Sequence, residues 1–479
     1  MSRRVLHLLV LLALACGVRL WLGPHLVDDA YITFRYARNL AAGAGFVYNP
    51  CEPVLGTSTP LFTLLLAAAA RCGAGIPETA FALGILGDLL VITAVHRALH
   101  RSGLPLAADI ADIAGLLLAA LPLYVFHSLS GMETSLYTGL LALAVDAYAG
   151  ERMSRASLWL GLAAVTRPEG CLLAAVLGGH RLWTRRRLTL REMAPFVLVV
   201  APWLIYASLA FGSPLPQSVR AKAAASSGDW RSSLANWLSV FGGTPSHLVL
   251  SLLSLAGLAV AARGRAWLWL WSLWAVLVSA LFIAGNAYNY AVWYYGPLLA
   301  PYLALAACGL GAGLAAAGRV ARRFAHRFVP PRPDLLRTAA LALLAAASLA
   351  VLLPRLAADR DAARAQRRER EDLYREVALA LPRDPAPLPV LAASEIGVLG
   401  YYYPGPILDL VGLVSPQAVG RTDRDKIAAA RPAWIVSYDS HLDPALLGSP
   451  ELARDYALVR TEIISPRRSL LVLRRRSPS

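Results

Sequence analysis

Two adjacent carboxylates, Asp28 and Asp29, stand just after an apolar segment at residues 5–22. That segment follows Arg3 and Arg4 and is long enough to cross a membrane, which takes about 20 apolar residues. A carboxylate pair beside a membrane could act as a general base or hold a divalent cation such as Mg²⁺ or Mn²⁺. The structural alternative is that one aspartate caps a helix beginning here while the other favours its dipole. Local sequence leaves both interpretations open.

The composition of the 479-residue chain indicates a membrane protein. Hydrophobic residues make up 57% and charged residues 16%, whereas soluble domains carry about 25% charged residues. The net charge of +16 would suggest nucleic acid in a soluble protein. Here the basic residues cluster between apolar segments, as the positive-inside rule requires, so we expect a lipid bilayer and no nucleic acid as partner. A disordered chain, a coiled coil and a disulfide scaffold are excluded.

The basic clusters predict the topology. The first arginines place the N-terminus in the cytoplasm, and the clusters at 152–155, 181–191, 263–265 and 319–337 mark later cytoplasmic loops. Eleven spans are expected, with thirteen as the alternative: 5–22, 78–95, 109–127, 134–150, two arms of a hairpin at 156–182, 193–211, 247–262, 267–285, 296–317 and 338–353. This parity places the loop 23–77 in the periplasm. The apolar stretch 61–70 is then expected to be an interfacial or re-entrant helix that does not cross.

The composition changes after residue 354. A charged helical stretch and a proline-rich link lead to short apolar runs that alternate with polar turns, as strands do. We therefore predict a mainly α, polytopic membrane helical bundle at 1–354 and a small periplasmic α/β domain at 355–479. The five cysteines show no metal-binding spacing, and Cys51 and Cys72 could pair in an oxidising compartment.

The run from Asp28 to Phe62 resembles the first periplasmic loop of bacterial GT-C glycosyltransferases, most closely the group containing the mycobacterial terminal arabinofuranosyltransferases. The matching positions are Asp28, Asp29, Arg35, Tyr36, Asn49, Pro50 and Glu52, while Cys51 replaces a preferred glycine. Four further stretches resemble the family's motifs in order: 130–134, 166–170, 212–217 followed by Ala221 and Lys222, and 397–403 with 409–413. Gln217 stands where asparagine is usual.

The resemblance implies a GT-C-like membrane glycosyltransferase at the periplasmic face of a bacterial inner membrane. It would move a sugar from polyprenyl phosphate to a glycan, glycolipid or protein hydroxyl, with inversion of the anomeric centre. Asp28 would accept the proton of the acceptor hydroxyl or hold that hydroxyl for attack. Asp29 would orient Asp28 or the hydroxyl, or help bind a divalent cation. The donor-phosphate residues would be Arg167, Lys222 and Tyr294, and the acceptor or supporting residues would be Arg35, Glu52, Glu133 and Glu169. The alternatives are a structural ion pair between Arg167 and Glu169 and a solvated position for Lys222.

Two other functions stay open. A transporter or flippase for lipid-linked sugars would also use charges beside apolar spans. It should display paired repeats or broken helices in matching halves, and the sequence shows no long-period repeat. A non-catalytic scaffold of envelope assembly would explain the C-terminal domain but would leave the paired aspartates without a role.

Overall fold

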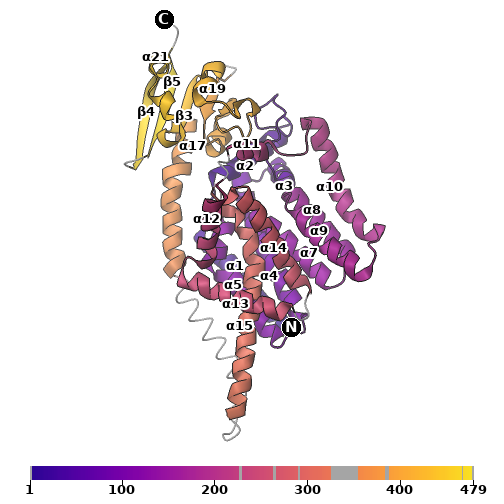
Figure 1. Cartoon of the computed structure of the whole chain (residues 1–479). Helices are drawn as coiled ribbons and strands as arrows, with labels where there is room; N and C mark the ends of the chain where they lie inside the picture. The colour runs from indigo at the N-terminus through magenta and orange to yellow at the C-terminus, as the bar shows by residue number, and fades with distance from the viewer. Residues whose placement is uncertain are drawn as a thin grey trace. The chain divides into compact units, whose positions relative to one another are not determined.

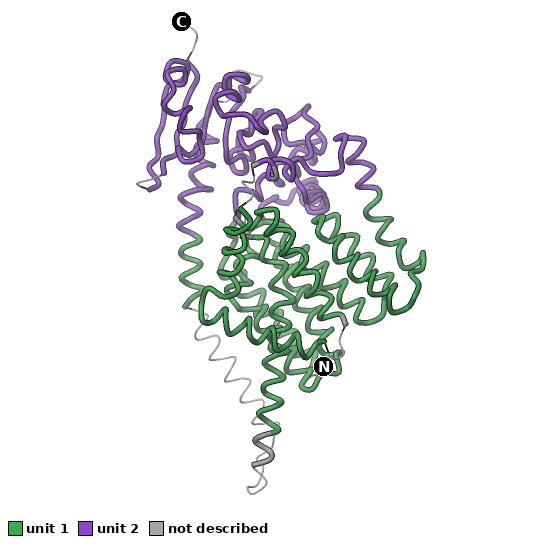
Figure 2. Tube along the Cα trace, in the orientation of Figure 1, with its two compact units in different colours: residues 1–25, 81–201, 228–363 green, residues 26–80, 202–227, 364–479 purple. Residues whose placement is uncertain are grey.

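The computed structural model describes residues 3–225, 229–262, 266–289, 292–324, 354–382, 388–465 and 468–476. Within these residues helices predominate, and the strands all lie beyond residue 390 (Figure 1). The chain divides into two compact units (Figure 2). Unit 1 comprises residues 1–25, 81–201 and 228–363, and unit 2 comprises residues 26–80, 202–227 and 364–479. The first loop thus groups with the C-terminal residues, while the boundary predicted after residue 354 stays a prediction.

Five helices are long and apolar enough to cross a membrane, which confirms the predicted helical membrane bundle. They are α1 (Arg3–Leu22), α4 (Ile76–His100), α10 (Leu190–Phe211), α14 (Ala266–Ala284) and α15 (Gly296–Phe324). The number rises to seven if each of two bent pairs is one span. These pairs are α5 (Ala107–Ala120) with α6 (Pro122–Ser128), bent by 57°, and α12 (Trp230–Gly242) with α13 (Pro245–Ala261), bent by 87°.

Three further helices occupy predicted spans but are shorter than about 20 residues. They are α7 (Thr134–Ala149), α8 (Met153–Thr166) and α9 (Gly170–Arg185), and the last two form the predicted hairpin. The segment predicted at 338–353 lies outside the described residues. The count of eleven spans therefore stays a prediction.

Both bends begin at a proline. Pro122 starts α6 and Pro245 starts α13. Proline lacks the N–H that a helix interior needs, and it pushes the preceding residue into an extended conformation. Leu121 and Thr244 are both extended, and the Thr244 hydroxyl accepts the N–H of His247 at 3.2 Å as a helix cap. The bends are thus encoded locally.

Unit 2 contains a five-stranded sheet in the order β2-β1-β3-β5-β4. The strands are β1 (Leu391–Ala393), β2 (Ile407–Asp409), β3 (Trp434–Tyr438), β4 (Tyr456–Ser465) and β5 (Arg468–Arg475). Strand β1 runs parallel to β2 and β3, and β5 runs antiparallel to β3 and β4. The helices α17 (Leu373–Ala380), α18 (Gly397–Tyr402), α19 (Asp423–Ala430), α20 (Pro444–Leu447) and α21 (Pro450–Asp455) complete the predicted α/β fold.

Three helices from earlier in the chain also belong to unit 2: α2 (Asp28–Ala41), α3 (Pro60–Arg71) and α11 (Gln217–Ala225). Helix α3 covers the apolar stretch 61–70. Its 12 residues span about 18 Å at 1.5 Å per residue, well below a hydrocarbon core of about 30 Å. All five cysteines, including Cys51 and Cys72, are free.

Candidate active site

The Asp28 carboxylate binds the start of another helix. Its two oxygens accept the backbone N–H groups of Gly397 and Val398, the first residues of α18, at 2.9 and 2.8 Å. The N-cap of α2 is instead Val27, which makes no side-chain cap, so the expectation that Asp28 caps its own helix is wrong. A helix start leaves its first N–H groups without intrahelical partners, and the buried Asp28 side chain satisfies two of them.

Two glycines of α18 allow this contact. A Cβ atom on Gly397 would lie 1.7 Å from the carbonyl oxygen of Asp28, and one on Gly400 would lie 1.8 Å from the Tyr48 hydroxyl. Real Cβ atoms do not approach heavy atoms below 3.0 Å. The Gly-x-x-Gly spacing of residues 397–400 therefore presents a face without side chains to the first loop.

The Asp28 carboxyl lies in an unusual electrostatic environment. Burial raises the pKa of Asp28 to about 7, and the nearby negative charge of Glu395 acts in the same direction. The charge of Arg370 and the N–H of Val398 oppose this rise in pKa. Arg370 itself donates from Nε to Glu395 at 3.2 Å. Sequence reasoning missed Arg370 and Glu395, since neither stands in a recognisable motif.

Asp29 differs from its neighbour. Its side chain is half-buried, and its carboxylate forms no hydrogen bond or ion pair with the part of the chain that the structure describes. Of the two adjacent carboxylates, Asp29 is therefore the one whose oxygens are available to a substrate.

The cation site predicted at this pair stays a prediction. Each Asp28 oxygen accepts one backbone N–H, which leaves each oxygen a second lone pair that could bind a cation. Among the described residues, the side chains that group with suitable spacing are His96, His100 and Asp112 in unit 1. Asp28 and Asp29 supply two carboxylates, and the mechanism proposed below assigns no catalytic step to a cation held by them.

Arg35 is a structural residue. It is fully buried, and each of its five N–H groups faces an acceptor, so none is left for an acceptor substrate. The acceptors are the carbonyls of Tyr48 at 2.7 Å, Gly400 at 2.7 Å, Tyr403 at 3.3 Å and Gly405 at 2.8 Å, and Asn49 Oδ1 at 3.1 Å.

Asn49 and Gln217 also join distant segments of unit 2. Asn49 exchanges two hydrogen bonds with the backbone of Ile407, at 2.9 and 3.0 Å. The backbone N–H of Gln217 donates to the carbonyl of Leu55 at 2.6 Å, and its side chain donates to Gly412 at 3.3 Å. These bonds anchor the start of α11, which carries the half-buried Lys222.

Glu52 lies exposed at the surface of unit 2. One of its oxygens, Oε2, accepts from the Asn49 side chain at 3.0 Å. Glu52 therefore remains accessible to solvent beside the segment that Asn49 anchors.

A second cluster of predicted residues forms in unit 1. Arg167 lies within 3.1 Å of both Glu133 and Glu169, and its guanidinium sits 5.1 Å from the ring centroid of Tyr294. Burial alone would lower the pKa of Arg167, but the two carboxylates outweigh it and raise that pKa. The ion-pair alternative for Arg167 and Glu169 is thus the arrangement found, with Glu133 as an additional partner. A guanidinium already facing two carboxylates is poorly suited to hold a donor phosphate.

We expect Arg167→Ala to destabilise unit 1 by about 3–5 kcal/mol, because it leaves two buried carboxylates without their cation. The triple variant Arg167→Leu, Glu133→Gln, Glu169→Gln removes all three charges and should recover most of the lost stability. Thermal unfolding of the purified protein in detergent measures both. Equal loss in the single and triple variants would contradict the role of Arg167 as the counter-charge of this cluster.

The buried carboxyl of Glu371 is expected to make the stability of the protein depend on pH. It is buried in the π-helical turn at Arg368–Asp372, and its Oε2 has no hydrogen-bond partner among the described residues. Burial raises the pKa of Glu371 to about 7, above its ordinary value of 4.5. Between these values the folded state holds a proton that the unfolded state has lost, so this group's contribution to stability falls as pH rises.

Glu371→Gln should therefore be more stable than the parent protein above pH 7, on the order of 1–3 kcal/mol. The advantage should disappear below about pH 4.5, where the parent glutamate is protonated in both states. Melting temperatures of both proteins across this range test the prediction. A difference that does not change with pH would show that Glu371 is not held protonated by burial.

Solved structures with a similar fold include ArnT and the oligosaccharyltransferase AglB. No curated protein matches the chain, and a family described as a domain of unknown function (DUF8728) matches residues 361–476. ArnT from Cupriavidus metallidurans, bound to undecaprenyl phosphate, superposes with a TM-score of 0.60 at 17% identity, over 98% of this chain and 97% of that chain. The oligosaccharyltransferase AglB from Archaeoglobus fulgidus was solved in complex with an inhibitory peptide and a dolichol-phosphate. It superposes with a TM-score of 0.51 at 12% identity, over 91% of this chain and 69% of that chain.

A second structure of the Archaeoglobus fulgidus oligosaccharyltransferase, tethered to an acceptor peptide, gives a TM-score of 0.55 at 12% identity, over 96% and 72%. Identities this low report the fold. The similarity to the arabinofuranosyltransferase group stays a prediction. Because the likeness to ArnT runs over nearly the whole of both chains, this protein has the GT-C fold.

Proposed function

We propose that this protein is a multi-pass membrane glycosyltransferase. It takes a sugar from a polyprenyl-phosphate donor and transfers it to a glycan, glycolipid or protein hydroxyl at the periplasmic face of the inner membrane. The observation that carries the proposal is the half-buried Asp29 carboxylate, which forms no described hydrogen bond. It stands next to Asp28, which is hydrogen-bonded to α18, in a chain with the GT-C fold. The donor class follows from the undecaprenyl phosphate bound by ArnT and the dolichol-phosphate bound by AglB.

Asp29 acts as the general base in this proposal. Its carboxylate accepts the proton of the acceptor hydroxyl while that oxygen attacks the anomeric carbon. The bond from the anomeric carbon to the phosphate oxygen breaks on the opposite side, which inverts the centre and releases polyprenyl phosphate. A base needs a free oxygen within hydrogen-bond reach of the proton, and this favours Asp29 over Asp28.

Asp28 is a positioning residue. Its two hydrogen bonds to α18 fix the first turn of α2, and with it the backbone that carries Asp29. Arg35, two turns further along α2, holds the other end of α18 through the carbonyls of Gly400 and Tyr403. The C-terminal domain thus serves the reaction by holding the base in place.

Lys222 is the proposed partner of the leaving phosphate. An ammonium is a compact point charge suited to a phosphate, whose negative charge grows in the transition state. Gln217 anchors the helix that carries Lys222 to Leu55 and Gly412. The exposed Glu52 is the proposed acceptor-binding carboxylate. The Arg167 cluster, including Tyr294, has a structural role in the helical bundle.

The direct test is incubation of the purified protein with labelled sugars on polyprenyl phosphate, on polyprenyl diphosphate and on a nucleotide. Release of free polyprenyl phosphate, with transfer or hydrolysis of the sugar, is the expected result for the first donor alone. Turnover of the nucleotide sugar instead would overturn the donor class.

A further inference from the structure

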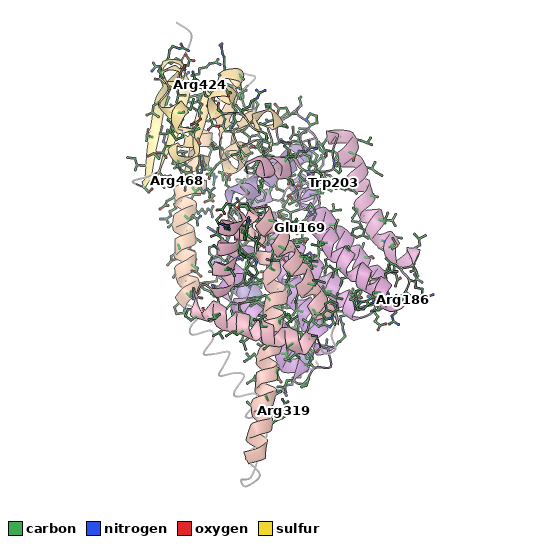
Figure 3. All side chains as sticks on the ribbon, in the orientation of Figure 1. Glu169, Arg186, Trp203, Arg319, Arg424 and Arg468 are labelled. Carbon is green, nitrogen blue, oxygen red and sulfur yellow. The ribbon has the colours of Figure 1, made fainter. Side chains whose placement is uncertain are left out.

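The loop end of the α8–α9–α10 group in unit 1 contains an arginine-rich cavity of about 730 Å³. It lies at the opposite end of α9 from Glu169, as the labels of Glu169 and Arg186 in Figure 3 show. Six arginines and two glutamates are among its lining residues: Arg152, Arg155, Arg181, Arg185, Arg187, Arg191, Glu151 and Glu192. These residues come from the loops predicted to be cytoplasmic.

Three of these arginines form no ion pair with any residue that the structure describes. Arg181 pairs with Glu192 at 2.6 Å, and Arg185 pairs with Glu151 at 3.0 Å. Arg152 lies 3.7 Å from Asp146. The remaining lining arginines form no ion pair with described residues and are exposed: Arg155, Arg187 and Arg191. The cavity therefore carries a positive charge that the described protein does not balance.

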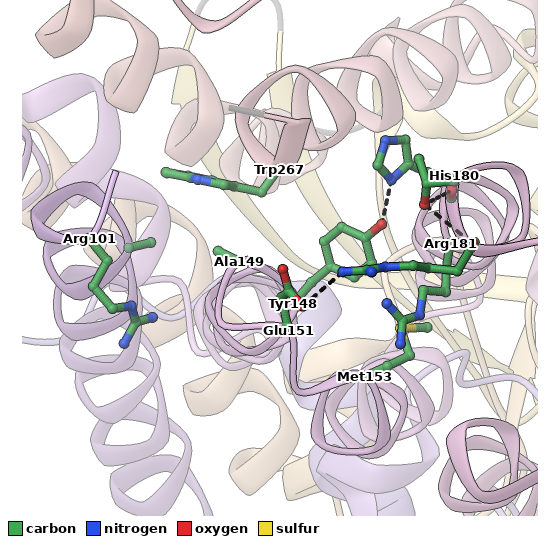
Figure 4. A pocket seen from close by; sticks show the side chains of 11 residues that line it. Arg101, Tyr148, Ala149, Glu151, Met153, His180, Arg181 and Trp267 are labelled. Carbon is green, nitrogen blue, oxygen red and sulfur yellow. Dashed lines mark hydrogen bonds and ion pairs between the residues drawn. The ribbon is translucent and has the colours of Figure 1, made fainter. Parts of the chain in front are cut away.

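An adjoining cavity of about 410 Å³ extends this polar region (Figure 4). It shares Glu151, Arg181 and Arg185 with the first cavity. Tyr148 and His180 hydrogen-bond to each other on its wall. Hydroxyl and guanidinium donors together suit a phosphate oxygen.

An apolar cavity of about 320 Å³ continues from the same place between α8, α9 and α10. Met153 lines all three cavities. Apart from Ser157, the lining residues of the apolar cavity are non-polar, and they extend along α9 from Gly178 to Cys171. That distance is about 10 Å. Helix α10, which forms one wall, has only 6% of its apolar stretch buried, as expected for a helix that faces lipid.

A ligand that fills both regions must carry an anionic head and a hydrocarbon chain. We propose that this end of unit 1 binds an anionic phospholipid, with its phosphate among Arg155, Arg187 and Arg191 and an acyl chain along Gly178. Basic pockets between membrane helices on the cytoplasmic side recognise such head groups. The site lies at the other end of α8 from Arg167 and is independent of the proposed transfer reaction.

The head-group arm of the test uses the purified full chain in neutral detergent and native mass spectrometry. Phosphatidylglycerol should bind at least 10-fold more tightly than phosphatidylcholine with the same chains, since each basic residue near an anionic lipid contributes about 1 kcal/mol. The triple change Arg155→Gln, Arg187→Gln, Arg191→Gln should weaken phosphatidylglycerol binding by about 100-fold. A control removes the same charge from exposed arginines outside the cavities: Arg319→Gln, Arg421→Gln, Arg476→Gln. Equal loss in both triple variants, or no preference over phosphatidylcholine, would overturn the site.

The second part of the test concerns the acyl chain and compares two adjacent glycines of α9. An added Cβ meets no heavy atom within 4 Å at Gly178 or at Gly179, but only Gly178 lines the apolar cavity. Gly178→Leu should therefore weaken phosphatidylglycerol binding about 10-fold, while Gly179→Leu should leave it unchanged. Soluble glycerol phosphate should not compete at the same concentration. Competition by glycerol phosphate, with no effect of Gly178→Leu, would assign the cavity to a free phosphate and overturn the lipid proposal.

Discussion

Replacing Asp29 by asparagine should reduce sugar transfer by about 10²–10⁴-fold, the range expected when a general base is removed. The side chain keeps its size, and it has no described hydrogen bond to lose, so the melting temperature should stay that of the parent protein. Initial rates with a polyprenyl-phosphate sugar and a thermal melt of the same preparation measure both quantities.

Asp28→Asn is the matched comparison for Asp29→Asn. The new amide keeps one acceptor for the N–H groups of Gly397 and Val398, but its NH₂ faces the other as a second donor. This should destabilise the fold by about 1–3 kcal/mol and lower transfer through misplacement of Asp29. A parent-like rate in Asp29→Asn, with transfer lost in Asp28→Asn without loss of stability, would return the base to Asp28.

Gly397→Ala should destabilise unit 2 by about 3 kcal/mol, the upper end of the usual cost of overpacking, and abolish transfer. The added Cβ would stand 1.7 Å from the backbone oxygen and 2.5 Å from the backbone carbon of Asp28. Backbone atoms cannot rotate away as a side chain does, so α18 or the start of α2 must shift. Helix propensity alone predicts the opposite, since alanine is favoured over glycine in a helix by about 1 kcal/mol.

Gly448→Ala controls for the loss of a glycine from the same domain. Its nearest heavy atom would be 3.7 Å from the new Cβ, so stability and transfer should not change. The comparison requires the melting temperature and the initial rate of both variants. If Gly397→Ala behaves like Gly448→Ala, the close packing of α18 on the first loop does not hold the site.

Periodicity, charge clusters and hydropathy predicted the helical bundle and the C-terminal α/β fold. These features are local: an apolar run that is long enough becomes a membrane helix, and Pro122 and Pro245 place the bends. The ion pair between Arg167 and Glu169 could also be predicted from the sequence, because the two residues are two positions apart. Glu133, the other partner of Arg167, is 34 positions away and has no local signal for this contact.

The roles within the first loop could not be assigned from the sequence. The Asp28 carboxylate contacts Gly397, 369 positions further along the chain, and such a contact distinguishes Asp28 from Asp29. The same holds for Arg35. The family resemblance gave it an acceptor or supporting role, but its N–H groups all face acceptors within unit 2. Packing between distant segments decides which polar residue stays available for chemistry.

The central claim is that the protein cleaves a lipid-linked sugar with Asp29. Its most direct test places the purified protein and Asp29→Asn in separate liposomes that contain a labelled polyprenyl-phosphate sugar, and follows both free polyprenyl phosphate and movement of the intact donor across the bilayer. The account predicts release of polyprenyl phosphate by the parent protein, at least about 100-fold less by Asp29→Asn, and no movement of intact donor by either. Movement of the intact donor without cleavage, equal in both proteins, would contradict it and identify a flippase.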